Sequence, residues 1–193
     1  IMESEGGEGM VKASGVLLRE HQSLRDALEV LEEICFLLRA EQEILVEDIQ
    51  ALVDFLMRYS RDLHQQKEEK LLFPALEKAG VSRSEGHFAM LEASHEIGAV
   101  YLRQLVAAGN RAYLNRDEFI EAAESYLRLQ LEHIDAEEAG LFRLADERLS
   151  PPAQLDLIAE FERYDREVVG ADKIEEAGHV LAYFHMKYME NMD

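Results

Sequence analysis

Two stretches of the chain carry a histidine and a glutamate four residues apart. They read HQQKEEKLLF from His64 and HIDAEEAGLF from His133, so His, Glu, Glu, Leu and Phe recur at an offset of 69 residues. Residues four apart lie one above the other on a helix. His64 with Glu68, and His133 with Glu137, would therefore each present a nitrogen and an oxygen in one direction, which is a pattern that suits a metal ion.

Each of these stretches is preceded by a helical segment with one further histidine, His21 before the first and His95 before the second. Helical spacing places all six side chains on apolar stripes, where an unpaired charge or imidazole is costly. A metal centre removes that cost. Four imidazoles and two carboxylates without a thiolate suit two divalent ions bridged by the carboxylates, and favour iron or manganese over structural zinc. An apolar pocket around such a pair allows redox chemistry with a small gas.

The elements that must position these residues are predicted to be helices throughout. Leu, Ala, Glu and Arg, which are strong helix formers, dominate the chain, and no stretch alternates like a strand. We expect helices over 13–40, 46–73, 84–109, 116–148, 152–169 and 172–190, with Pro74, Pro151 and Pro152 marking breaks. The fold class is thus all-α: an up-down-up-down four-helix bundle with two additional C-terminal helices.

The chain is predicted to consist of three parts. Residues 1–12, with Gly6, Gly7 and Gly9, are expected to form a flexible leader or an expression-tag remnant. Residues 13–150 would form the four-helix bundle, and residues 151–193 would form helices packed outside it.

Composition restricts the partners. Forty acidic against 20 basic side chains give a formal net charge of −20, which disfavours nucleic acid and anionic membranes. The single cysteine, Cys35, precludes an internal disulfide, and no apolar run approaches the ~18 residues that a membrane span needs. The N-terminal residues lack the basic and apolar regions of a signal peptide, so we expect a soluble cytoplasmic protein.

The chain resembles the hemerythrin-like, or HHE cation-binding, family. The resemblance covers about residues 16–146 and is carried by Arg-Glu-His at 19–21, HxxxEExxLFP at 64–74, His-Glu-x-Gly at 95–98 and HIxxEExxLF at 133–142. It implies a centre of two iron ions. By this resemblance His21 and His64 would hold one iron, and His95 and His133 would hold the other. Glu68 and Glu137 would bridge the two ions.

Two positions depart from the oxygen-carrying members of that family. Leu91 stands where they have a second histidine one turn before His95, and Glu137 follows its histidine by four residues where they have an aspartate at five. One iron would then have an open position, which favours oxygen or iron sensing, or redox handling, over simple carriage. We expect a non-heme di-iron protein that binds dioxygen or a related small oxidant.

The alternatives are a peroxidase, a catalase-like or nitric oxide reducing enzyme, and an iron donor for cluster repair, so whether the chain is an enzyme stays open. The small ligands would be dioxygen, peroxide or nitric oxide, and any signalling output would need a protein partner. A ferritin-type oxidase is disfavoured, because that family orders its ligands as Glu-x-x-His.

Several other residues are not expected to bind the metals. Glu69 and Glu138 are expected to be solvated helix residues rather than partners of the ligands. Phe73 and Phe142 fit either the wall of a metal pocket or ordinary bundle packing. Cys35 would lie roughly 21 Å along its helix from His21 and act as a small core hydrophobe. His87 is expected to begin a helix, and His179 and His185 are expected to be structural or surface residues.

Overall fold

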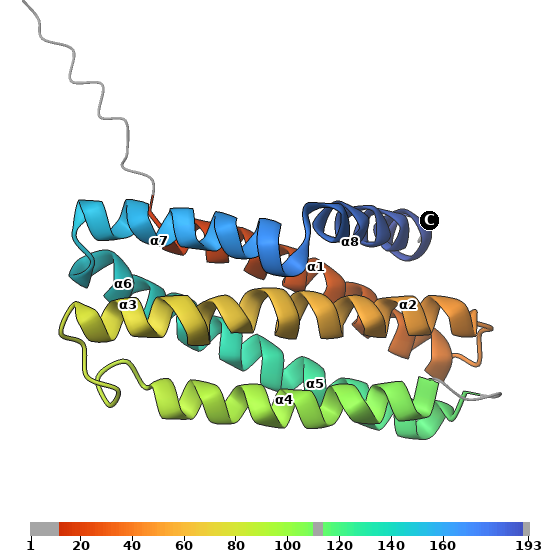
Figure 1. The fold of residues 1–193 in the computed structure, drawn as a ribbon. Coiled ribbons are helices and arrows are strands. Elements are labelled where there is room, and N and C mark those ends of the chain that lie inside the picture. The colour runs from red at the N-terminus through yellow and green to blue at the C-terminus, as the bar shows by residue number, and fades with distance from the viewer. Residues whose placement is uncertain (1–11, 110–113, 191–193) are drawn as a thin grey trace, which may run out of the picture.

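The computed structural model describes residues 12–109 and 114–190, and within them every regular element is helical. The predicted leader at 1–12 lies outside the described residues, apart from Lys12. Two of the long helical segments are single α-helices, α1 (Ser14–Arg39) and α4 (Phe88–Gly109). The long segments lie side by side and pack against one another (Figure 1).

The two segments with the His-x-x-x-Glu pairs are composite. The first runs through α2 (Val46–Leu56), the π-helical stretches η1 (Met57–Gln65) and η2 (Glu68–Leu72), and α3 (Phe73–Lys78). The second runs through α5 (Arg116–Ala136), the π-helical turn η3 (Glu137–Leu141) and α6 (Phe142–Arg148). Asn115 begins α5 by accepting a hydrogen bond from the backbone N–H of Glu118, a common N-terminal cap.

Two predicted boundaries are wrong. The second helical segment continues through Pro74 to Lys78 because this proline lies in the first turn of α3, where a missing N–H is tolerated. The next helix begins at Phe88 rather than at residue 84. Ser82 accepts a hydrogen bond from the Glu85 N–H, and His87 has a φ of 54°, so this stretch forms turns instead of a helix.

The predicted stripes are buried and form two apolar clusters. One cluster takes in α1 from Leu24 to Leu38 with parts of α2, α4 and α5. The other takes in Leu17, α3, the start of α4, and α6. The six predicted metal ligands occupy the helical turns between the two clusters, so a polar centre divides the core of the bundle.

The C-terminal helices close both clusters. They are α7 (Pro151–Tyr164), η4 (Asp165–Val169), α8 (Ala171–Phe184) and η5 (His185–Met189). Phe161 of α7 is fully buried in the cluster around α3 and α6, whereas Phe184 is buried in the other. The Tyr188 hydroxyl also donates a 2.5 Å hydrogen bond to Asp48. Within the described ranges no helix is both long and apolar enough to cross a membrane.

Candidate metal centre

The six predicted ligands converge at one place in the core. They form two overlapping groups that could each hold a metal ion, with all ligand atoms of a group within 4.8 Å of one another. Both groups contain the carboxylates of Glu68 and Glu137, as bridging ligands would. The histidines are divided between the groups in pairs, His21 with His64 and His95 with His133.

The imidazole nitrogens of each pair face one another. His21 Nε2 lies 2.8 Å from His64 Nε2, and His95 Nε2 lies 3.0 Å from His133 Nε2. Metal–nitrogen bonds of about 2.1 Å place two nitrogens that bind one ion at a right angle about 3 Å apart. Both nitrogen pairs therefore have the separation that a shared ion requires.

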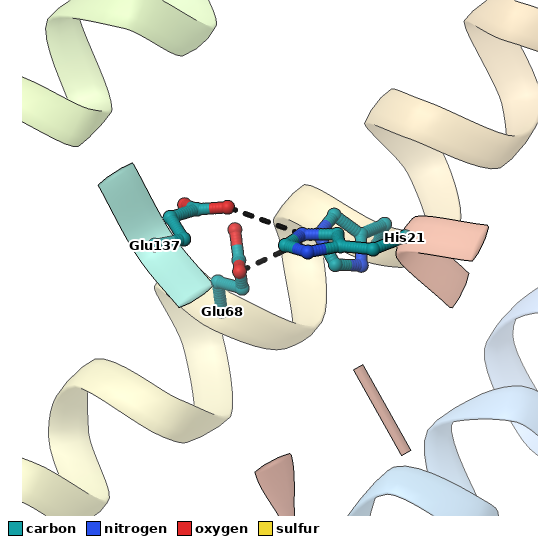
Figure 2. Close-up of side chains that lie close together, drawn as sticks. His21, Glu68 and Glu137 are labelled. Carbon is teal, nitrogen blue, oxygen red and sulfur yellow. Dashed lines mark hydrogen bonds and ion pairs between the residues drawn. The ribbon is translucent and has the colours of Figure 1, made fainter. Parts of the chain in front are cut away.

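The two carboxylates lie between the histidine pairs. Glu137 approaches His133 Nε2 at 3.0 Å and His21 Nε2 at 3.3 Å. Glu68 approaches His64 Nε2 at 3.4 Å and His95 Nε2 at 3.5 Å. Figure 2 shows Glu68 and Glu137 projecting from different helices toward the ring of His21.

The oxygens of these carboxylates have no hydrogen-bond partner. Glu68 and Glu137 are fully buried, and none of their four oxygens is hydrogen-bonded within the described part of the chain. Buried carboxylates are normally paired or bind metals, because an unsatisfied buried charge is costly. Four orphaned oxygens among four imidazole nitrogens are thus the donor set that two divalent ions would satisfy.

The helix geometry changes where the two carboxylates stand. Glu68 is the first residue of η2, and Glu137 is the first residue of η3. In these turns the backbone hydrogen bonds run from i to i+5, and single π-helical turns of this kind are frequent at functional sites. The repeat seen in the sequence is therefore matched in the backbone at the two glutamates, although His64 lies in η1 and His133 in α5.

A scan against protein families gives a match over residues 13–145, to the hemerythrin HHE cation-binding domain. The chain belongs to this family. The match includes all six residues of the centre and ends before α7, so the C-terminal helices lie beyond the family domain. The predicted family resemblance is confirmed, and a cation-binding role accords with the two groups of ligand atoms.

The curated relatives of this hemerythrin-like chain carry no functional description. Uncharacterized proteins of Mycobacterium tuberculosis and of Mycobacterium bovis are each 26% identical to it over 156 residues, 79% of this chain and 60% of the relative. The chain thus spans about 60% of the length of the curated relatives it matches. No solved structure matches it significantly.

Three of the histidines in this hemerythrin-like centre have a carboxylate on the ring nitrogen that faces away from the ligand group. His21 Nδ1 lies 3.0 Å from Glu138 Oε1, and His95 Nδ1 lies 2.6 Å from Glu69 Oε1. The expectation that Glu69 and Glu138 are solvated is therefore wrong: each follows a predicted bridging glutamate and reaches back to a histidine on a neighbouring helix. Such carboxylates orient a ligating imidazole and raise its basicity.

The third carboxylate belongs to Glu20, which the sequence analysis did not single out. Glu20 Oε2 lies 2.9 Å from His64 Nδ1, and Glu20 Oε1 lies 2.5 Å from the ammonium of Lys67. A signal for both residues was present. Glu20 stands three residues after Leu17 and four before Leu24, and Lys67 stands four after Leu63, so each is a charged residue at an inward-facing position of an apolar stripe.

The fourth histidine breaks the symmetry of the repeat. His133 Nδ1 is buried, and no described residue offers it a hydrogen bond. Ala136, at the offset of 69 residues from Lys67, is exposed. The two histidine pairs therefore resemble each other in their inward nitrogens and differ in what surrounds the outward ones.

In the metal-free centre the histidines and the carboxylates shift one another's pKa values. Burial by itself would lower the pKa of His64, but the carboxylates of Glu68 and Glu20 raise that pKa above its usual value. Burial would likewise raise the pKa of Glu137, but His133, His21 and His95 hold it well below its usual range. The histidines and carboxylates of the centre thus favour each other's charged forms, as a bound metal cation would favour the charged form of the carboxylates.

The remaining candidates lie as follows. Phe142 stacks on the His21 ring with centroids 4.9 Å apart and so lines the centre. Phe73 instead stacks on Phe88 within the core. Cys35 is buried in the cluster that follows Leu24, as expected for a core hydrophobe. Neither group of candidate ligands includes any of the other histidines, namely His87, His179 and His185.

Proposed function

We propose that this hemerythrin-like chain is a non-heme di-iron protein that binds dioxygen or a related small oxidant and serves in oxygen or iron sensing or redox handling. One iron would be held by His21 and His64 and the other by His95 and His133, while Glu68 and Glu137 bridge them. The observation that carries the proposal is the convergence of four buried imidazoles on two buried carboxylates, whose four oxygens accept no hydrogen bond within the described part of the chain.

The proposed frame is an up-down-up-down bundle over residues 13–150, with residues 151–193 as helices packed on it. The course of the four long segments in Figure 1 supports this topology, and the family match at 13–145 supports the domain boundary. Short connections between long helices favour antiparallel neighbours.

Bound ferrous ions would supply electrons to a small oxidant, and the chain's own residues would prepare the place for it. The carboxylates of Glu69, Glu138 and Glu20 hold three imidazoles with their inward nitrogens directed to the centre. Leu91, which is buried four residues before His95, and the Phe142 ring, which stacks on His21, would restrict the access of water. A buried apolar surround of this kind admits small uncharged ligands and excludes larger reductants.

Metal analysis of anaerobically purified protein tests the proposal. We expect two iron ions per chain and a change in the visible absorption spectrum when air is admitted. A chain that takes up neither iron nor another divalent ion would overturn the proposal. Turnover of added peroxide or nitric oxide by the iron-loaded protein would instead favour the enzymatic alternatives, which the absence of a second histidine near His95 also suits.

Leu91→His is expected to change the reactivity of one iron. The new imidazole would stand one turn before His95 on the same helix face and add a nitrogen to the iron held by His95 and His133. We expect slower oxidation of the ferrous protein by peroxide, measured by stopped-flow absorbance, and slower reaction with dioxygen. Equal rates, together with a crystal structure that shows the new imidazole on the iron, would mean that the open position does not set reactivity.

A further inference from the structure

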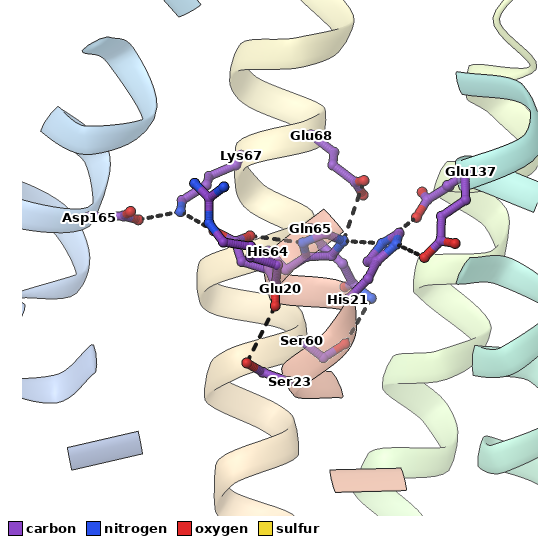
Figure 3. A network of polar contacts seen from close by, with 12 residues as sticks. Glu20, His21, Ser23, Ser60, His64, Gln65, Lys67, Glu68, Glu137 and Asp165 are labelled. Carbon is purple, nitrogen blue, oxygen red and sulfur yellow. Dashed lines mark hydrogen bonds and ion pairs between the residues drawn. The ribbon is translucent and has the colours of Figure 1, made fainter. Parts of the chain in front are cut away.

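A buried lysine links the candidate metal centre to the C-terminal helices. Lys67 is 0% exposed, and its ammonium contacts two carboxylates, Glu20 Oε1 and Asp165 Oδ1, each at 2.5 Å. The other oxygen of Glu20 lies 2.9 Å from His64 Nδ1. Figure 3 shows this continuous row of charged groups running from Asp165 through Lys67 and Glu20 to His64.

The C-terminal segment provides much of the surroundings of that lysine. Asp165 is the first residue of η4, and Phe161 on the preceding turn of α7 lies with its ring centroid 5.9 Å from the Lys67 ammonium. Both residues lie beyond the family match, which ends at residue 145. A fully buried ammonium is stable only when it is paired, and one of its two partners here comes from outside the bundle.

We propose that Asp165, Lys67 and Glu20 clamp His64 in its metal-binding orientation, so that docking of α7 and η4 is coupled to metal binding at the His21–His64 position. This inference rests on the proposed function. When a metal is bound, Glu20 would accept a hydrogen bond from the Nδ1–H of His64, which leaves the Nε2 lone pair directed at the centre. Lys67 holds Glu20 in place by its second oxygen, and Asp165 fixes Lys67 from the other side.

The coupling works in both directions. If docking of η4 strengthens metal binding, metal binding must strengthen the docking of η4 by the same factor. Only one half of the centre has this connection, because the position that corresponds to Lys67 in the second half is the exposed Ala136. Lys67, Glu20 and Asp165 are therefore positioning residues for the metal site formed by His21 and His64. The docking of the C-terminal segment then depends on whether that site holds a metal ion.

Asp165→Asn tests the coupling without changing the size of the side chain. We expect about a 10-fold weaker affinity for Fe²⁺ at one of the two positions, measured anaerobically by competition with a chelator. The other position should keep its affinity. Asp156→Asn is the matched control, since it makes the same change on an exposed residue of α7. Asp165→Glu, which keeps the charge, should restore most of the affinity.

Hydrogen exchange supplies a second readout that needs no variant. Amides of residues 151–169 in the wild-type chain should exchange more slowly with Fe²⁺ than without it, and Asp165→Asn should abolish that difference. Equal exchange with and without metal, or an unchanged Fe²⁺ affinity in a folded Asp165→Asn protein, would overturn the inference. A wild-type chain that binds no metal would instead overturn the proposed function, so the two failures are distinguishable.

Discussion

Glu137→Ala is expected to abolish the rise in melting temperature that ferrous iron gives the wild-type chain. The glutamate contributes an oxygen to both groups of ligand atoms, so its removal weakens both positions. A ligand at 100 times its dissociation constant stabilises a protein by about 2.7 kcal/mol, and that gain is lost with the site. Melting followed by circular dichroism, with and without Fe²⁺ under anaerobic conditions, measures the difference, and metal analysis of the same samples gives the occupancy.

Glu132→Ala, on the exposed face of the same helix, is the control and should retain the metal-dependent rise. Without metal, Glu137→Ala should itself be less stable than the wild type, because His133, His21 and His95 lose the carboxylate that they contact, so the comparison is of the Fe²⁺-dependent rise in each protein. Full retention of two irons by Glu137→Ala would contradict the assignment of the bridging ligand.

Lys67→Met is expected to lower the free energy of unfolding by about 3–5 kcal/mol even in metal-free protein. The methionine fills the space of the lysine stem but leaves two carboxylates, Glu20 and Asp165, without their shared cation. Burial by itself raises the pKa of Glu20, and His64 and Lys67 lower it below its usual value, so the loss of Lys67 removes part of what keeps this carboxylate ionised. Urea unfolding of metal-free protein measures the change.

The control for this prediction is Lys70→Met, three residues further along at an exposed position. It should change the unfolding free energy by less than about 0.5 kcal/mol. A Lys67→Met protein as stable as the control would show that the buried ion pairs contribute nothing to the stability of the fold.

Ligands that lie on the same helix could be predicted from the sequence. A four-residue spacing fixes that His64 and Glu68 share a face, and the apolar stripe fixes that this face is inward. The boundary error at Pro74 arose because a proline in the first turn of a helix does not end it, and the error before Phe88 arose because Ser82 and the left-handed His87 hold turns there.

The residues that surround the ligands from outside the apolar stripes could not be assigned this way. Glu69 and Glu138 look like ordinary solvated helix residues until the neighbouring helix brings a histidine to each of them. Asp165 lies far along the chain from Lys67, and no periodicity within either helix indicates that the two meet. Partners of this kind follow from how the helices pack, which a spacing rule within a single helix does not determine.

The unequal surroundings of His64 and His133 affect how strongly each of the two positions binds a metal ion. The carboxylate of Glu20 makes the His64 imidazole a stronger donor, whereas His133 has no such partner among the described residues. Two positions with different donor strength differ in their affinity for the same divalent ion, so we expect the His21–His64 position to fill before the His95–His133 position. Anomalous scattering from crystals loaded with one ion per chain would show which position is occupied.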